Sequence, residues 1–81
     1  MSGANALAGV SLPDLVREHA LKHLARIERA EDLLSVSLAL ERAEGYGEGL
    51  EVIRALNPAD LEALYIAFDN AATARRQVLE G

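Results

Sequence analysis

The stretch from residue 14 to residue 44 contains neither glycine nor proline, and no other feature constrains the fold so strongly. Most of its residues are good helix formers. The segment before it resembles a helix start, with Ser11 placed as N-cap and Pro13 in the first turn. The sequence therefore predicts one long helix over residues 13–44.

Apolar residues within this predicted helix indicate which face is buried. At 100° per residue, about the helical value, one stripe holds Val16, Ala20, Ile27, Leu34 and Leu38, with Leu24 and Ala30 at its edges. Several apolar residues of the second half lie well away from this stripe, so a single neighbouring helix cannot cover them. We therefore expect a dimer core built from Ile27, Leu33, Leu34, Val36, Leu38 and Leu40.

The stretch Gly-Tyr-Gly-Glu-Gly, residues 45–49, follows the predicted long helix. A phosphate-binding loop would follow a strand and would not carry Glu48 between neighbouring acids, so that interpretation is set aside. We interpret the stretch as a hinge, with Gly45 as a left-handed helix cap, followed by a short helix over residues 49–56. Tyr46 is expected to fold back onto the helices or to serve as a contact anchor.

A second helix start is evident at Asn57, which precedes Pro58 and lies three residues before Asp60. It predicts a third helix over residues 58–79. Its broad apolar face consists of Leu61, Leu64, Tyr65, Phe68, Ala71, Ala72 and Leu79. A strip of small residues on another side would let a second backbone approach closely; it consists of Ala63, Ala67, Ala71 and Ala74.

The chain has 81 residues, of which 51% are hydrophobic and only 4% aromatic, a balance that suits helices better than sheets. We predict an all-α helical bundle with a flexible lead-in over residues 1–10 and a single domain over residues 11–81. Because a domain of this size buries a thin core, completion by dimerisation is expected.

The sequence offers little that could carry catalysis. It has no cysteine, which removes thiolate nucleophiles and the common structural zinc sites. His19 and His23 have the spacing of two metal ligands, but Lys22 and Arg26 lie on the same side and no third ligand is evident. We predict a non-enzymatic protein without a metal site or a cofactor.

The net charge is −5, and its distribution is uneven. Basic residues gather at the front of the first helix, at Arg17, Lys22, Arg26 and Arg29, whereas acidic residues dominate from Glu31 to Asp69. The overall charge argues against nucleic acid as a partner. No apolar run is long enough to span a bilayer, so we expect no membrane partner and a cytoplasmic location.

These features favour a small regulatory protein, a homodimer that binds and modulates a larger protein. Two alternatives remain open: an acidic inhibitor of a nucleic-acid-binding machine, of the phage or mobile-element anti-defence type such as an anti-CRISPR, and a small DNA-binding regulator. The expected partner surface has an apolar centre and a polar rim. It comprises Ile66, Glu62, Asp69, Asn70 and Tyr46.

Overall fold

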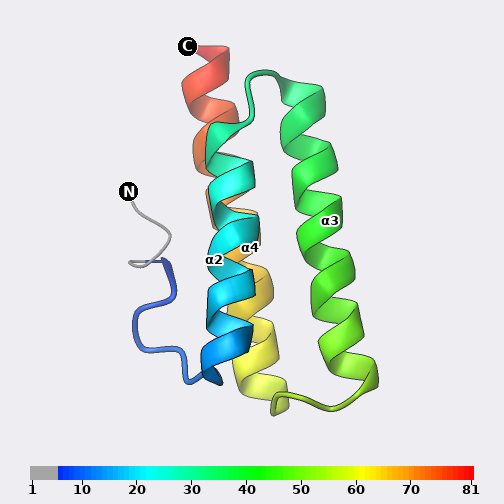
Figure 1. The fold of residues 1–81 in the computed structure, drawn as a ribbon. Helices are drawn as coiled ribbons and strands as arrows, with labels where there is room; N and C mark the ends of the chain where they lie inside the picture. The colour runs from blue at the N-terminus through cyan, green and yellow to red at the C-terminus, as the bar shows by residue number, and fades with distance from the viewer. Residues whose placement is uncertain (1–5) are drawn as a thin grey trace.

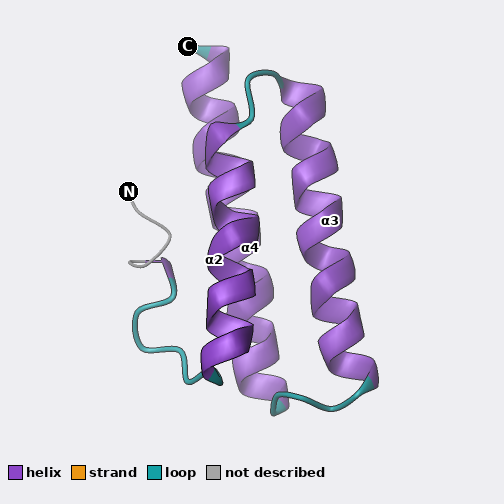
Figure 2. Cartoon of the chain, viewed as in Figure 1, coloured by secondary structure: helices purple, strands orange, loops and turns teal. Residues whose placement is uncertain are grey.

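The computed structural model describes residues 6–81 and folds them into three helices, α2 (Asp14–Arg29), α3 (Leu33–Val52) and α4 (Pro58–Glu80). Successive helices run in opposite directions, and each helix contacts the other two (Figure 1). Loops and turns join these helices, and residues 6–81 contain no strand (Figure 2). The predicted all-α bundle is confirmed, although several of its helix boundaries differ.

The start of α2 lies close to the predicted position but uses a different cap. Pro13 is the N-cap residue, and its carbonyl oxygen accepts a hydrogen bond from the backbone N–H of Arg17 at 2.9 Å. No side chain caps this helix, so the assignment of Ser11 as N-cap is wrong. The fixed φ of proline, −56° here, is compatible with this position even without a capping hydroxyl.

The single helix predicted over residues 13–44 is wrong, because the chain leaves the helical conformation at residues 30–32. Asp32 begins α3 as an N-cap, and its carboxylate accepts a hydrogen bond from the backbone N–H of Ser35 at 2.7 Å. On the other side of the break, the carbonyl oxygen of Ala30 accepts a hydrogen bond from Nε of Arg75 on α4 at 2.8 Å. Side chains thus satisfy backbone groups at a break that needs neither glycine nor proline.

The predicted hinge at residues 45–49 is also wrong, because all five residues lie inside α3. Gly45 is helical and has no positive φ, so it is not a left-handed cap. The short helix predicted over residues 49–56 does not form as a separate element: α3 ends at Val52 and the chain then turns. Arg54 takes the left-handed conformation in this turn, with φ 54°.

Close packing against α4 explains why a glycine occupies position 47 in the middle of α3. Gly47 is buried, and a Cβ atom at this position would lie 2.6 Å from Cε1 of Tyr65 on α4. The absence of a side chain therefore lets the Tyr65 ring pack directly against the α3 backbone. Gly45 and Gly49 differ, because a Cβ atom at either position would meet nothing within 4 Å.

The start of α4 is confirmed as predicted. Oδ1 of Asn57 accepts a hydrogen bond from the backbone N–H of Asp60 at 2.9 Å, and Pro58 occupies the first turn. The amide of Asn57 also donates a hydrogen bond to the Asp60 carboxylate at 2.8 Å. The helix then runs one residue beyond the predicted end, to Glu80.

The core lies along the line where the three helices meet. Its buried apolar residues are Leu7, Ala20, Leu24, Ile27, Ala30, Val36, Ala43, Leu50, Leu61, Leu64, Ala67, Phe68 and Ala72. The expected lead-in at residues 1–10 lies outside the described residues as far as residue 5. From there on the segment packs onto the bundle, since Leu7 is fully buried and its carbonyl oxygen accepts a hydrogen bond from the Val10 N–H at 3.1 Å.

Leu34 and Leu38 do not belong to this core, contrary to the stripe predicted for a continuous helix. They are 69% and 56% exposed. The non-helical residues 30–32 change the phase of α3 relative to α2, so a stripe extrapolated from Val16 and Ile27 points away from the bundle after the break. Val36, which the stripe excluded, is fully buried instead.

Candidate functional site

On the side of α3 that faces away from the bundle, a line of apolar and acidic residues is left exposed by the rest of residues 6–81. Its residues follow alternating steps of four and three positions, the spacing of residues that share one line along a helix. We call this line the outer face of α3; it consists of Leu34, Leu38, Glu41, Gly45, Glu48 and Val52, all of them exposed. The opposite side of the same helix is buried through Val36, Ala43, Gly47 and Leu50.

The apolar members of the outer face lie toward its two ends. Leu34 and Leu38 occupy the first half of α3, and Val52, which is 81% exposed, is its last residue. Beside Leu38 the surface is hollowed, and the hollow is lined by Ser35, Leu38, Ala39, Glu41 and Arg42. Between these ends lie Glu41, Gly45 and Glu48, and Gly45 leaves one position near the middle of the face without a side chain.

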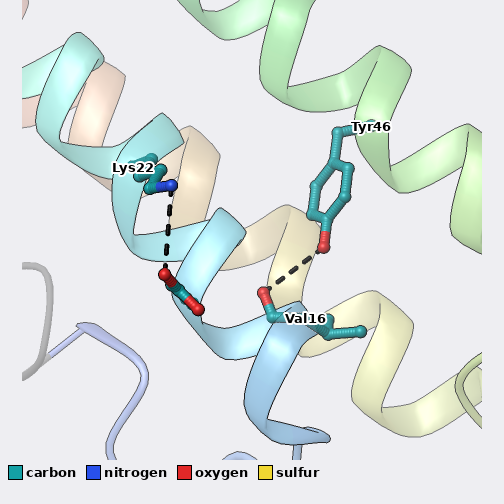
Figure 3. A network of polar contacts seen from close by, with 4 residues as sticks. Val16, Lys22 and Tyr46 are labelled. Carbon is teal, nitrogen blue, oxygen red and sulfur yellow. Dashed lines mark hydrogen bonds and ion pairs between the residues drawn. The ribbon is translucent and has the colours of Figure 1, made fainter.

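The outer face is also acidic. α3 carries Glu41, Glu44, Glu48 and Glu51 against a single cation, Arg42. None of these carboxylates forms an ion pair within residues 6–81, where the ion pair observed is that of Lys22 with Glu18 on α2, 4.0 Å apart (Figure 3). The acidic surroundings extend to α4: burial first, and then Glu51, Glu48 and Glu44, raise the pKa of Tyr65.

The residues of the predicted partner surface on α4 are exposed, as expected. Ile66 is 51% exposed, and the side chains proposed as its rim, Glu62, Asp69 and Asn70, are exposed as well. Tyr46 does not extend this surface. Its hydroxyl donates a hydrogen bond to the carbonyl oxygen of Val16 on α2 at 3.3 Å (Figure 3). The ring therefore joins α3 to α2 in the manner of the folded-back alternative, and burial raises the pKa of its hydroxyl.

His23 lies in the same contact between helices. Its ring stacks on Tyr46 with centroids 5.0 Å apart and meets the edge of Phe68 at 6.1 Å. Nδ1 of His23 lies 3.3 Å from a guanidinium nitrogen of Arg26. Burial is the main cause that lowers the pKa of His23, followed by the charges of Arg26, Arg42 and His19.

The histidine pair considered as a metal site is thus used in packing. The ring centroids of His19 and Tyr46 lie 6.1 Å apart, while the His23 ring packs against both Tyr46 and Phe68. Within residues 6–81 no three histidine, cysteine or acidic side chains gather as metal ligands would.

Some of the basic residues on α2 are occupied within the domain. The guanidinium of Arg17 donates hydrogen bonds to the carbonyl oxygens of Leu7 and Val10, which ties the N-terminal turn to α2. Arg26 lies against His23, as described above. Lys22, Arg26 and Arg29 are exposed at the spacing of one line along α2, but Lys22 is paired with Glu18.

The residues predicted as the dimer core divide into two groups. Ile27 and Val36 are fully buried within one chain, and Leu40 is partly buried. Leu33, Leu34 and Leu38 are exposed, Leu33 to 47%. Only the exposed residues are available to a second chain, and Leu34 and Leu38 belong to the outer face of α3.

A second hollow lies over the alanine strip of α4. It has a volume of about 320 Å³ and is lined by Ala6, Glu28, Ala67, Asn70, Ala71, Ala74, Arg75 and Val78. Three of the four alanines in the predicted strip line it, so the strip does leave space beside the α4 backbone. The Arg75 side chain on its wall already binds the carbonyl oxygen of Ala30.

Comparison of the chain with protein-family models, with curated proteins and with solved structures finds no match. None of the helices formed by residues 6–81 combines the length and apolarity that crossing a membrane requires. The chemistry of the exposed surface is therefore the basis for assigning a function.

Proposed function

We propose that this chain is a small, non-enzymatic helical interaction protein that binds and modulates a larger protein through the outer face of α3. The observation that carries the proposal is the exposure of Leu34, Leu38 and Val52 on one line of a helix whose opposite side is anchored in the core. Large apolar residues aligned on a solvated helix face are typical of binding surfaces.

Removal of these side chains from water can supply part of the binding energy. Full burial of a leucine or valine side chain contributes roughly 1.5–3 kcal/mol. Association costs at least about 4 kcal/mol in lost translational and rotational freedom. Three partly exposed side chains therefore support only weak binding by themselves, and polar contacts around them must contribute to a stable complex.

The test compares partner capture by the wild-type chain and by the double variant Leu34→Gln/Leu38→Gln. Each chain is cross-linked in cells and its partners are quantified by mass spectrometry. We expect a set of partners that the double variant loses by about tenfold or more, about 1.4 kcal/mol or more of binding energy. Circular dichroism should show unchanged helix content, because neither leucine is part of the core.

A matched control is available elsewhere on the chain. Leu15 on α2 and Val78 on α4 are 69% and 66% exposed, similar to the two leucines, but lie on other helices. The variant Leu15→Gln/Val78→Gln should capture the same partners as the wild type. If capture survives Leu34→Gln/Leu38→Gln but is lost in Ile66→Gln, the partner surface is the outer side of α4 and the proposal is wrong.

Self-association through the same face is the second candidate, because Leu33, Leu34 and Leu38 are the exposed part of the expected dimer core. Sedimentation equilibrium across micromolar concentrations measures it directly. A dimer that Leu34→Gln/Leu38→Gln converts to monomer would support it. A monomer at all concentrations would exclude it.

A further inference from the structure

The outer face of α3 has the geometry needed to hold one more helix. Positions that alternate by four and three residues keep one line facing a neighbouring helix, as in coiled coils. With 20 residues, α3 is about 30 Å long, so this line extends over several turns. The face is continuous from Leu34 to Val52, and all six of its residues are exposed.

The shape of the face is uneven along this line. Leu34, Leu38 and Val52 project at its ends, while Gly45 near its middle leaves the backbone uncovered. A Cβ atom built on Gly45 meets nothing within 4 Å, so the space above it is open. A partner helix can therefore approach closely at Gly45 or place a large side chain there.

Two carboxylates on the outer face of α3 determine which side chains a partner helix needs. Glu41 and Glu48 lie within the line itself, four residues before and three residues after Gly45. A purely apolar helix laid over them would bury both charges without partners, which costs several kcal/mol per ion. Lysine or arginine opposite them would instead form charge-assisted hydrogen bonds.

We propose that the occupant of the outer face of α3 is a cationic amphipathic helix of another protein. Its apolar stripe packs on Leu34, Leu38 and Val52, and its basic residues pair with Glu41 and Glu48. This inference rests on the proposed function and adds the chemical class of the partner.

A second copy of the chain fits this face less well. In a parallel pair, Glu41 and Glu48 would each face their own counterparts, and like charges in contact are destabilising. In an antiparallel pair centred near Ala43, Glu48 would lie against Leu38 of the other copy and Glu41 against its Gly45. Neither arrangement places a cation within the line, and Arg42 is the single basic residue of α3.

The basic helix α2 of a second copy is also a poor match. Its exposed surface offers cations at Lys22, Arg26 and Arg29, but Leu15 is its only exposed large apolar residue within the described chain. It would satisfy Glu41 and Glu48 while leaving Leu34 and Leu38 without apolar contacts. The charge of −5 carried by each chain further opposes association of two copies.

The experiment uses the full chain and two synthetic peptides of equal length, about three heptads each. Both peptides carry leucine at the two core positions of the heptad; one has lysine at the flanking positions and the other glutamate. Calorimetric titration measures the affinity of each peptide. We expect the lysine peptide to bind with one-to-one stoichiometry and the glutamate peptide to bind at least about tenfold more weakly.

Variants assign the binding to this face. Leu34→Gln/Leu38→Gln should lower the affinity for the lysine peptide by about tenfold or more. Leu15→Gln/Val78→Gln should leave this affinity unchanged. Glu41→Gln/Glu48→Gln should reduce the preference for lysine over glutamate, and its effect should shrink in high salt. Equal binding of both peptides, or binding unaffected by the leucine variants, would overturn the inference.

The result also separates this inference from the proposed function. If the lysine peptide fails to bind but the leucine variants abolish capture of cellular partners, the face binds protein and the class of partner is wrong. If the leucine variants instead convert a dimer of the chain to a monomer, the occupant of the face is a second copy. If neither peptide binding nor capture depends on the leucines, both proposals are wrong.

Discussion

Gly45 and Gly47 both lie within α3, but substitution by alanine should change stability in opposite directions at the two positions. A glycine in a helix interior is less stable than alanine by roughly 0.5–1 kcal/mol. Since the space around Gly45 is open, Gly45→Ala should raise the free energy of unfolding by about this amount. Gly47→Ala should lower it, because the new Cβ atom would lie 2.6 Å from Cε1 of Tyr65. Urea denaturation of the two variants measures both changes.

The Tyr65 ring provides the control for Gly47. In a Tyr65→Ala background the obstructing ring is gone, so Gly47→Ala should become neutral or stabilising. A Gly47→Ala variant as stable as Gly45→Ala, with Tyr65 in place, would mean that the close contact between α3 and α4 does not constrain this position.

His23 makes stability depend on pH. Its pKa in the folded chain lies below the ordinary value of 6.5, chiefly through burial and then through Arg26, Arg42 and His19. As the pH falls below 6.5 the unfolded chain takes up a proton that the folded chain resists. The contribution of His23 to stability is therefore fully present above this pH and is lost as the pH falls through the lower pKa of the folded state.

Chemical denaturation at several pH values between about 7.5 and 5 measures this dependence. His23→Gln removes the titrating group and should flatten the decline over this range. An equally steep decline in His23→Gln would assign the effect to other groups and contradict the role given to His23.

The break before α3 depends on Asp32. Its carboxylate accepts a hydrogen bond from the Ser35 N–H, and hydrogen bonding first to the Ser35 backbone and then to its side chain lowers the pKa of Asp32. Asp32→Ala should lower the melting temperature. Asp32→Asn should melt close to the wild-type temperature, because asparagine caps helices about as well as aspartate. Equal melting temperatures for wild type and Asp32→Ala would show that the cap does not hold the break.

The elements differ in how far the sequence predicts them. The start of α4 is predictable because Asn57, Pro58 and Asp60 form a local signal that acts without the rest of the fold. The break before α3 has a weaker local signal, a single Asp32 cap in a run of helix formers, and a distant contact with Arg75 supports it. The continuation of α3 through Gly47 is not predictable locally, because its cause is a ring on another helix.

How well the candidate site can be predicted also depends on how well the helix starts can be predicted. Leu34 and Leu38 fall on the predicted buried stripe only if the helix is unbroken, and the break at residues 30–32 removes that condition. With a cap at Asp32 recognised, the spacing of four and three residues from Leu34 to Val52 would indicate a separate face of its own helix. The exposure of Ile66 was predictable because α4 begins where its local signal places it.

The three helices together bury one apolar core and leave the outer face of α3 uncovered. The core includes Val36 and Leu50 from α3, so this helix is anchored without the outer face. The exposed leucines therefore contribute little to the stability of the single chain. A charge placed on this face should be tolerated, whereas a charge placed on the opposite face of α3 should not.

The free energies of unfolding of Leu34→Asp and Val36→Asp test this claim most directly. Leu34→Asp should remain within about 0.5 kcal/mol of the wild type, as for a surface substitution. Val36→Asp would bury an unpaired carboxylate and should lose about 3 kcal/mol or more, or fail to fold. If Leu34→Asp is instead destabilised as much as Val36→Asp, Leu34 belongs to the core and the outer face of α3 is not free to bind a partner.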